Sequence, residues 1–560
     1  MKPIEHDERP SPGSGTAGKG AAPGGGAAFL AAVVPALAAW AVLAWRFDWL
    51  NDDAFISFRY ARNLARGLGL CFNPGVHPPV EGYSNFLWNV YLALFELLHL
   101  DVTLFSRLTT ALAAAVLLVY TAAAARRALG LDCFQTLWTA LFFGTLPTVV
   151  VWSTGGLETA VAGLLLFTVY ERLLGDPDRP RPYGAGIAAV LFVLLREEAA
   201  AFMAVLLATA FLTGRFTRRR GLARAAGITS LFTAAAVLLF LAWRYAYYGD
   251  FLSNTARLKA GFHLFRVERG ALYAASYFLT VPSCLLVLLL PLLPRFRPKG
   301  LLALHAYLLI GADLAFAVLT GGDFMPMGRF LVYAMPFLAL LFAGVVKGAA
   351  GGKGRRRFLP AAAAAVPLVV LSLLPLFDVH PVPEGIRRKF SFRWHDPSIT
   401  DFSRLTEYGM WEAMKKANNR FVRLAKALKR WTRPGESIIL GAVGAVGYYT
   451  DLHIYDVYGL VNREVALRDA PPRPTLAAHD RAVPYAFFLG KEPTYLAALI
   501  LREKDLDRCL PQVKNLFPGL PPERMKVESH PLDPREFGKG KKVLVLVRYL
   551  PDRAPPEGPR

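Results

Sequence analysis

Apolar runs of about 17 to 23 residues recur from Ala27 to Phe377, each long enough, or nearly so, to cross a hydrocarbon core of about 30 Å. With 54% hydrophobic and 19% charged residues, the 560-residue chain is too apolar for a soluble protein of this size. We predict a polytopic α-helical membrane protein with about eleven transmembrane helices. The runs are Ala27–Trp45, Leu104–Ala125, Phe134–Trp152, Leu157–Leu174, Gly184–Leu195, Ala199–Thr213, Ala225–Tyr245, Ala271–Leu293, Leu301–Thr320, Phe330–Val346 and Phe358–Phe377.

The N-terminal segment differs in composition from the rest of the chain. Residues 1–26 are rich in Gly, Pro, Ser and Lys and cannot bury a core, so we expect a disordered cytoplasmic tail. The apolar run that follows is longer than the core of a signal peptide, and we interpret it as an uncleaved first helix. The transmembrane bundle then spans residues 27–377.

Basic connectors indicate the orientation of this bundle, because cytoplasmic loops are enriched in Lys and Arg. All of them lie on the cytoplasmic side if residues 84–125 cross the membrane only once. Ser84–Leu100 is then a juxtamembrane or re-entrant helix. A large loop, 46–83, and everything after Phe377 then lie on the outer face of the membrane. The connectors are Arg126-Arg127, Arg179 with Arg181, Arg215 to Arg224, Arg295 to Lys299 and Lys347 to Arg357.

The net charge of +22 does not indicate nucleic-acid binding, because the basic residues lie mostly between apolar segments, where they set topology. Four cysteines, Cys71, Cys133, Cys284 and Cys509, lack metal-ligand spacing, so we predict no metal site. A disulfide between Cys71 and Cys509 is conceivable, but no spacing pattern supports it.

Residues 378–560 have the composition of a soluble domain, with Pro, charge and short β-like runs. An amphipathic helix at about Asp401–Trp431 precedes the strand candidates, so we predict a small α/β domain. Gly441–Tyr449 is glycine-rich but lacks the dinucleotide-binding spacing, and tight packing of a strand on a helix explains it better. The strand candidates are Ser437–Leu440, Ile454–Val457, Tyr495–Leu501 and Lys542–Tyr549.

Two adjacent carboxylates, Asp52 and Asp53, follow the first helix at the membrane surface. Because neighbouring negative charges repel, one pKa can be raised toward neutrality, which suits a general base for an acceptor hydroxyl. The alternative is that Asp52 caps a helix that begins near Ala54.

The same loop continues through Glu81, Tyr83, Asn85 and Trp88. Carboxylate and amide groups can bond sugar hydroxyls, and rings can stack on the faces of a sugar. An interfacial aromatic belt explains the rings equally well, but it does not explain Glu81.

Charged residues also occur within or beside apolar runs, where each costs roughly 2.5 to 3.5 kcal/mol on insertion. Glu158 lies at the outer mouth of one crossing, and Arg196-Glu197-Glu198 separates two helices that are too short to span unaided. We interpret them as facing a cavity. The alternative is an ion pair between Arg196 and one of its glutamates that is purely structural.

Cations lie near the outer interface in two loops, one with Asn254 and Lys259, the other with Asp323 and Arg329. The phosphate of a lipid carrier would lie at this depth, and Lys or Arg is its natural partner. Snorkelling toward headgroups is the alternative for Lys259.

Together these motifs resemble the GT-C class of polyprenyl-phosphate-sugar-dependent glycosyltransferases, closest to the mycobacterial terminal arabinofuranosyltransferase (AftB-like) group. No single piece is diagnostic, but the ordered set is fairly specific. The matching pieces are Asp52–Arg59, Phe72–Gly75, Glu81–Trp88, Gly155–Glu158, Arg196–Glu198, Asn254-Thr255 with Lys259, Gly322–Pro326 with Arg329, and Gly444–Leu460. Arg196-Glu197-Glu198 departs from the usual Arg-Pro-Glu-Gly, which leaves its role open.

The resemblance implies an inverting, metal-independent transfer without a cofactor, from a polyprenyl-phosphate-linked sugar to an envelope glycan, lipid or protein. An Asp of the first loop would be the base, Asp52 in preference to Asp53, because the first acid of the pair aligns with the catalytic one in related enzymes. The substrate-binding residues would be Arg59, Glu81, Tyr83, Asn85, Trp88, Glu158, Arg196, Glu197, Asn254, Lys259, Asp323 and Arg329.

Two other classes of protein compete with this hypothesis. A transporter also carries intramembrane charges and broken helices, but this sequence shows no internal repeat, and its polar motifs cluster on one face. A non-catalytic envelope-assembly protein could use the soluble domain, but it would leave the acidic first loop unexplained.

Overall fold

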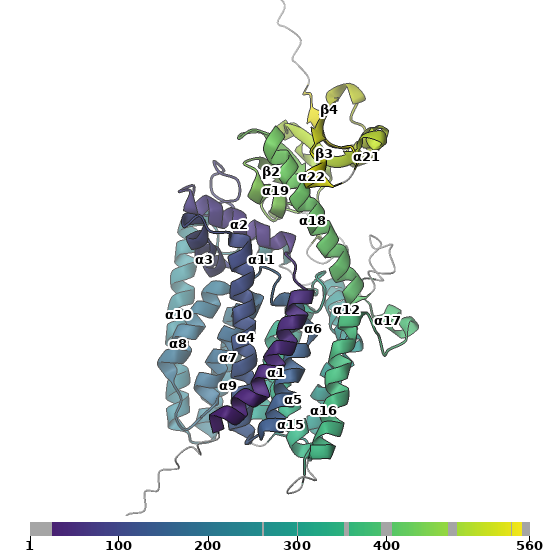
Figure 1. The fold of residues 1–560 in the computed structure, drawn as a ribbon. Helices are drawn as coiled ribbons and strands as arrows, with labels where there is room; N and C mark the ends of the chain where they lie inside the picture. The colour runs from purple at the N-terminus through teal and green to yellow at the C-terminus, as the bar shows by residue number, and fades with distance from the viewer. Residues whose placement is uncertain are drawn as a thin grey trace, which may run out of the picture.

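The computed structural model describes residues 25–259, 263–298, 301–351, 358–391, 393, 406–468, 479–538 and 540–551. They form a bundle of long helices with a small α/β domain at one end (Figure 1). We call this the domain end of the bundle. The helices of the bundle are α1 (Gly25–Arg46), α2 (Asp52–Ala65), α3 (Phe86–Leu97), α4 (Val102–Leu129), α5 (Cys133–Thr145), α6 (Pro147–Trp152), α7 (Thr159–Leu174), α8 (Pro182–Leu195), α9 (Ala199–Phe216), α10 (Arg220–Tyr248), α11 (Asn254–Lys259), α12 (Leu264–Thr280), α13 (Pro282–Leu289), η1 (Leu290–Leu292), α14 (Leu302–Leu319), η2 (Arg329–Ala334), α15 (Met335–Ala349), α16 (Phe358–Leu373) and η4 (Leu374–Phe377).

Every predicted apolar run is helical, and the chain is a multi-pass membrane protein. Among the described residues, 7 helices are long and apolar enough to cross a membrane, or 8 if α12 and α13 form one span bent by 95°. That bend lies at Pro282, and the break between α5 and α6 lies at Pro147. Both breaks are expected, because the residue before a proline avoids helical backbone angles.

The doubtful segment Ser84–Leu100 contains only α3, which lies beside α2 at the domain end (Figure 1). A helix of 12 residues is about 18 Å long, too short to cross a membrane. α4 then runs the length of the bundle, so residues 84–125 cross once, as predicted.

The α/β domain holds a five-stranded mixed sheet of order β2-β1-β3-β5-β4. β1 pairs in parallel with β2 and β3, and β5 pairs antiparallel with β3 and β4. Its elements, with the helices that lead to it, are α17 (Glu384–Phe390), α18 (Glu407–Trp431), β1 (Ser437–Leu440), α19 (Gly444–Tyr449), β2 (His453–Asp456), α20 (Arg463–Ala466), η6 (Tyr485–Lys491), β3 (Tyr495–Arg502), η7 (Glu503–Arg508), α21 (Cys509–Leu516), η8 (Pro522–Arg524), β4 (Met525–Leu532), α22 (Pro534–Phe537) and β5 (Lys542–Tyr549).

All four predicted strands are present, and the fifth, β4, was not predicted. It is an edge strand that reads MKVESHPL and is mostly exposed, so it lacks the apolar signal of a core strand. The predicted helix Asp401–Trp431 is α18, whose first described turn begins at Glu407. All four cysteines are free, so the disulfide considered from the sequence is absent.

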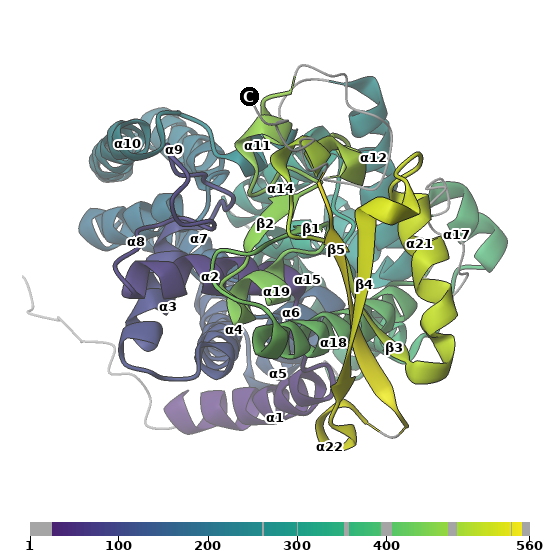
Figure 2. The same ribbon diagram turned by 90° about the horizontal axis from the view of Figure 1, so that it is seen from above.

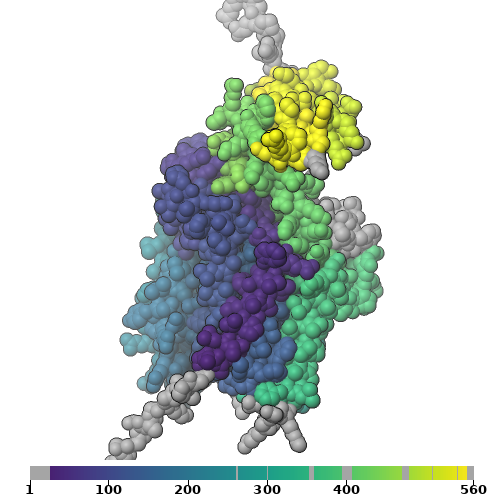
Figure 3. Space-filling model, viewed as in Figure 1, coloured from purple at the N-terminus to yellow at the C-terminus, as the bar shows by residue number. Residues whose placement is uncertain are grey.

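α18 joins the two parts of the molecule. It runs from the side of the bundle up to the sheet, and in the space-filling view it forms a continuous ridge between them (Figures 1 and 3). Seen along the bundle, α19 lies beside α2 and α18 lies alongside α19 (Figure 2). The α/β domain therefore covers part of the domain end of the bundle and leaves α8 and α10 uncovered (Figure 2).

Candidate active site

A cavity of about 560 Å³ lies between the bundle and the α/β domain. Most of the residues predicted to act on a donor reach it from separate parts of the chain. The predicted residues that line it are Asp52, Asp53, Tyr83, Asn85, Glu158, Arg196, Lys259 and Arg329. The predicted residues that do not line it are Arg59, Glu81, Trp88, Glu197, Asn254 and Asp323.

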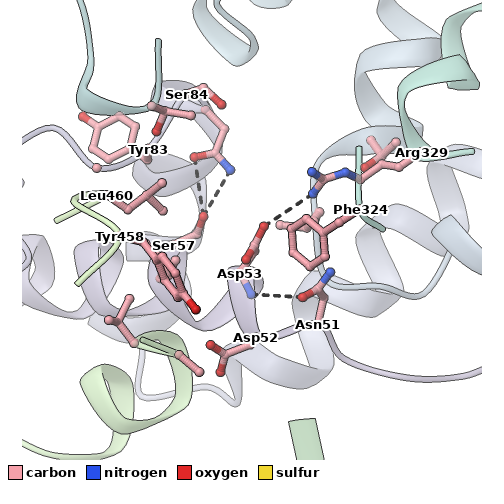
Figure 4. A pocket seen from close by; sticks show the side chains of 18 of the residues that line it. Asn51, Asp52, Asp53, Ser57, Tyr83, Ser84, Phe324, Arg329, Tyr458 and Leu460 are labelled. Atoms are coloured by element: carbon pink, nitrogen blue, oxygen red, sulfur yellow. Dashed lines mark hydrogen bonds and ion pairs between the residues drawn. The ribbon is translucent and has the colours of Figure 1, made fainter. Parts of the chain in front are cut away.

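The first turn of α2 presents the two adjacent carboxylates. The side chain of Asn51 caps this helix by accepting the Asp53 N–H at 3.1 Å. The alternative that Asp52 is the cap is therefore wrong, because the helix begins one residue after Asn51. Both aspartates are left free to face the cavity (Figure 4).

Asp52 reaches from α2 to the start of α19. Its carboxylate accepts the N–H groups of Gly444 at 3.0 Å and Ala445 at 2.9 Å. A Cβ at Gly444 would lie 2.0 Å from the Asp52 carbonyl oxygen, so only glycine permits this approach. Burial raises the pKa of Asp52 to about 6, although the bond from Ala445 opposes the rise.

Asp53 points the other way, toward Arg329, with 3.6 Å between carboxylate and guanidinium (Figure 4). Arg329 also pairs with Asp323, whose buried carboxylate accepts from Nε at 2.6 Å. Burial raises the pKa of Asp53, and the charge of Arg329 opposes the rise. The two aspartates thus have different electrostatic surroundings.

Lys259, the last residue of α11, lies on the same side of the cavity as Arg329. No carboxylate among the described residues lies within ion-pair distance of its ammonium, which lies 5.1 Å from the centre of the Phe330 ring. Burial lowers the pKa of Lys259, and the charge of Arg329 lowers it further. A partly buried cation without a carboxylate in ion-pair distance indicates a site for an anion. We call Lys259, Arg329, Asp53 and Asp323 the Lys259 side.

Arg196 organises a second group, between α8 and α9. Its guanidinium pairs with Glu158 at 2.5 Å and with Glu198 at 2.8 Å. Asn85 donates to Glu158 at 2.7 Å, and Tyr333 donates to Glu198 at 3.0 Å. We call these five residues the Arg196 side. Here every charge has a partner, as in the structural alternative raised from the sequence.

Glu81 and Glu197, which lie behind the cavity wall, both pair with one arginine, Arg244 of α10. Arg244 Nε lies 2.8 Å from Glu81, and Arg244 also pairs closely with Glu197, which accepts from Ser253 at 2.8 Å. Burial raises the pKa of Glu81 to about 8, although Arg244 opposes the rise. Because this group joins the loop after α2 to the start of α11, its contacts are structural. Arg244 was missed, and its only sequence signal is a lone charge in an apolar helix.

Arg59 holds the α/β domain against α2 and does not reach the cavity. Its guanidinium donates to the carbonyl oxygens of Gly447, Thr450 and, at 2.9 Å, Phe72. Trp88 is buried against Tyr91, with ring centroids 5.3 Å apart.

Asn254 and Asp323 also bind protein groups. Asn254 donates to the Gly459 carbonyl at 3.1 Å, and Asp323 is the partner of Arg329. Neither residue lines the cavity, and their predicted contact with substrate stays a prediction.

The cavity wall also contains residues that the sequence did not indicate. Phe421 and Asn418 belong to α18, and Tyr458 and His479 belong to the α/β domain. The His479 ring meets Tyr458 at 4.2 Å and Phe324 of the bundle at 5.1 Å. Long-range packing places these rings, and no local sequence pattern reports it.

Comparison with known proteins agrees with this architecture. The chain is similar to ArnT from Cupriavidus metallidurans bound to undecaprenyl phosphate, with a TM-score of 0.50, 15% identity, 94% of this chain covered and 98% of the other. The apo form of ArnT gives a TM-score of 0.49 at 15% identity, with 92% and 97% covered. The chain has the fold of a GT-C glycosyltransferase. The predicted fold class is thereby confirmed.

The remaining comparisons concern sequence. Residues 410–531, from α18 to β4, match a family described as a domain of unknown function, DUF8728. No curated protein matches the chain. The assignment to the fold therefore rests on three-dimensional similarity.

Proposed function

We propose that the protein is a glycosyltransferase that transfers a sugar from a polyprenyl-phosphate carrier to an acceptor of the cell envelope. One observation carries the proposal: a single cavity holds an acidic pair and, beside it, a partly buried lysine without a carboxylate partner among the described residues. The fold, shared with a protein whose structure contains undecaprenyl phosphate, supports this choice of donor.

The Lys259 side would bind the donor phosphate. Lys259 has no competing counter-ion among the described residues, and Arg329 needs only to relax its 3.6 Å contact with Asp53 to offer a second cation. Charge-assisted hydrogen bonds to phosphate are about twice as strong as neutral ones. They also stabilise the charge that develops on the leaving phosphate.

Asp52 is the better placed of the two aspartates to act as base. In an inverting transfer the attacking hydroxyl and the leaving phosphate lie on opposite faces of the sugar. Asp53 contacts Arg329, on the phosphate side, whereas Asp52 faces the α/β domain (Figure 4). A pKa of about 6 leaves Asp52 ionised at neutral pH yet basic enough to accept a proton.

The proposed reaction forms one bond and breaks one. The acceptor oxygen bonds to the anomeric carbon, the bond from that carbon to the phosphate oxygen breaks, and polyprenyl phosphate leaves with the bonding electrons. Asp52 takes the hydroxyl proton. Tyr83, Asn85 and Glu158 would surround the sugar, since all three line the cavity. As the resemblance implies, no metal or cofactor takes part.

The finer assignments rest on the sequence. The positive-inside pattern places the cavity on the periplasmic face of a bacterial inner membrane. The resemblance to terminal arabinofuranosyltransferases makes a polyprenyl-phosphate arabinofuranose the first donor to test. The acceptor would be an envelope glycan, lipid or protein that enters beside the α/β domain.

The test is transfer from labelled polyprenyl-phosphate sugars to extracted envelope acceptors by the purified protein. Asp52→Asn should lower the rate by about 10²- to 10⁴-fold, the usual contribution of a general base. Asp53→Asn should have a smaller effect. Asp451→Asn is the matched control, because Asp451 pairs with Arg62 outside the cavity. Transfer that persists in Asp52→Asn would refute its role, and solute transport without transfer would favour the transporter.

A further inference from the structure

The loop that carries Arg329 has an unusual backbone. Met327 has φ of 58° and the next residue, Gly328, has φ of 67°. A left-handed conformation is ordinary for glycine but uncommon for methionine, and it persists only where the surroundings hold it. Met327 is 1% exposed, so packing and hydrogen bonds, and not solvent, determine this conformation.

Hydrogen bonds fix Met327 on both sides. Its carbonyl accepts from the Thr148 hydroxyl at 2.7 Å, and its N–H donates to the carboxylate of Glu407. Glu407 is the first residue of α18 and is 5% exposed. The same carboxylate pairs with Arg393, which is fully buried and donates to the Met325 carbonyl at 3.4 Å.

The other contacts of this loop come from the bundle. Trp152 donates to the Pro326 carbonyl at 2.9 Å, and the amide of Asn51 contacts the Met325 sulfur at 2.6 Å. Glu407 and Arg393 instead belong to the segment that leads from the bundle to the sheet. The loop is therefore clamped between the bundle and the start of α18, two residues before Arg329.

We infer that Glu407 is a positioning residue, which holds the left-handed backbone at Met327 and thereby sets Arg329 at the cavity. The inference rests on the proposed function for the ligand of Arg329, but the clamp itself does not. An acid in the first turn of a helix also stabilises the helix dipole. That role would not require Glu407 to be buried against the N–H of a distant loop.

A double-mutant cycle separates the two roles. Glu407→Ala removes the acceptor of the Met327 N–H. Met327→Gly removes the need for the clamp, because glycine adopts φ of 58° without strain. The control is Glu412→Ala on the same helix, where Glu412 pairs with exposed Lys416 at 2.9 Å. Glu407→Gln keeps an oxygen that can accept the Met327 N–H, so it should leave exchange in residues 321–331 near wild type.

The first measurement is hydrogen exchange of the full-length protein in nanodiscs without ligand. Glu407→Ala should speed exchange in residues 321–331 by about tenfold or more, because a buried N–H loses its acceptor. Exchange in β5 should remain near wild type, whereas the unfolding temperature should fall, because fully buried Arg393 loses the carboxylate with which it pairs. Glu412→Ala should change neither. Unchanged exchange in residues 321–331, or faster exchange throughout the protein, would overturn the inference.

The second measurement is the affinity for undecaprenyl phosphate. Glu407→Ala should weaken binding about tenfold in the wild-type background and less than about threefold in Met327→Gly. Equal losses in both backgrounds would overturn the inference. If the wild-type protein does not bind undecaprenyl phosphate, the proposed donor is wrong. Hydrogen exchange of the same variants then still tests the clamp. The clamp is supported if Glu407→Ala speeds exchange in the wild-type background but not in the Met327→Gly background. It is refuted if the effects of the two substitutions add.

Discussion

The two sides of the cavity hold similar charged residues but differ in how their cations are paired. On the Arg196 side one guanidinium contacts two carboxylates, which accept further bonds from Asn85 and Tyr333. On the Lys259 side the lysine has no carboxylate partner among the described residues. Buried charges normally pair, because removing an ion from water costs several kcal/mol.

This difference in pairing indicates that the Arg196 side has a structural role and that Lys259 has a role in binding. A satisfied network gains nothing from an added charge, so the Arg196 side stabilises the helices and offers hydrogen-bonding groups to a sugar. An unsatisfied cation is stabilised when an anion arrives. Loss of Arg196 should therefore lower stability, and loss of Lys259 should lower affinity.

The largest expected effect is on stability. Arg196→Ala leaves the carboxylates of Glu158 and Glu198, which are 2% and 10% exposed, without their cation. Breaking a buried pair in this way costs roughly 3–5 kcal/mol. Thermal unfolding in detergent should show a large drop. Lys259→Met should unfold at or above the wild-type temperature, and an equal drop in both variants would remove the distinction.

Lys259→Met should act on ligand affinity instead. Hydrogen bonds to charged groups contribute about 1.5–3 kcal/mol, so affinity for undecaprenyl phosphate should fall about tenfold to a hundredfold. Titration of the ligand into nanodiscs measures it. Lys415→Met, which removes a lysine of α18 that donates to the Asp48 carbonyl, is the control. Unchanged affinity in Lys259→Met would mean that the anion binds at another site.

The pH dependence of transfer should report Asp52, which lies between the two sides. With a pKa of about 6, the base becomes protonated below that pH, and the rate should fall about tenfold per pH unit. The effect of lower pH on the free energy of unfolding has the opposite sign. Because the folded pKa lies above the ordinary 3.8, protonation of Asp52 between those values favours the folded state. Rates and unfolding temperatures that fall together would indicate acid unfolding instead.

The smallest effect is expected for Tyr333→Phe. It removes the hydroxyl that donates to Glu198 at 3.0 Å but leaves the guanidinium in place. A single such bond contributes about 1 kcal/mol, so the unfolding temperature should fall by a few degrees. Binding of undecaprenyl phosphate should not change. A loss of affinity comparable to that of Lys259→Met would mean that the two sides are coupled.

Much of the fold could be predicted because its signals are local. Apolar length indicates a helix wherever it occurs, and the charge of the connectors implies that residues 84–125 cross once. The same topology argument put Asp52, Glu158, Arg196, Lys259, Asp323 and the α/β domain on one face, and all of these residues except Asp323 line one cavity.

The rest depends on contacts between distant segments. No residue close to Arg59 in the sequence indicates that its guanidinium binds the carbonyl oxygen of Gly447. Likewise, no residue close to Glu407 in the sequence indicates that its carboxylate accepts the N–H of Met327. Arg59 therefore resembled a substrate ligand, and Glu407 an ordinary first-turn acid. A charged side chain in a motif does not reveal whether its partner is a ligand or the protein's own backbone.

The most direct test is a structure of the wild-type protein reconstituted with undecaprenyl phosphate. The account predicts density for the phosphate in the cavity, within hydrogen-bond distance of the Lys259 ammonium and the Arg329 guanidinium, with Arg196 still paired to Glu158 and Glu198. A phosphate bound at Arg196, or bound outside the cavity, would contradict the assignment of the two sides.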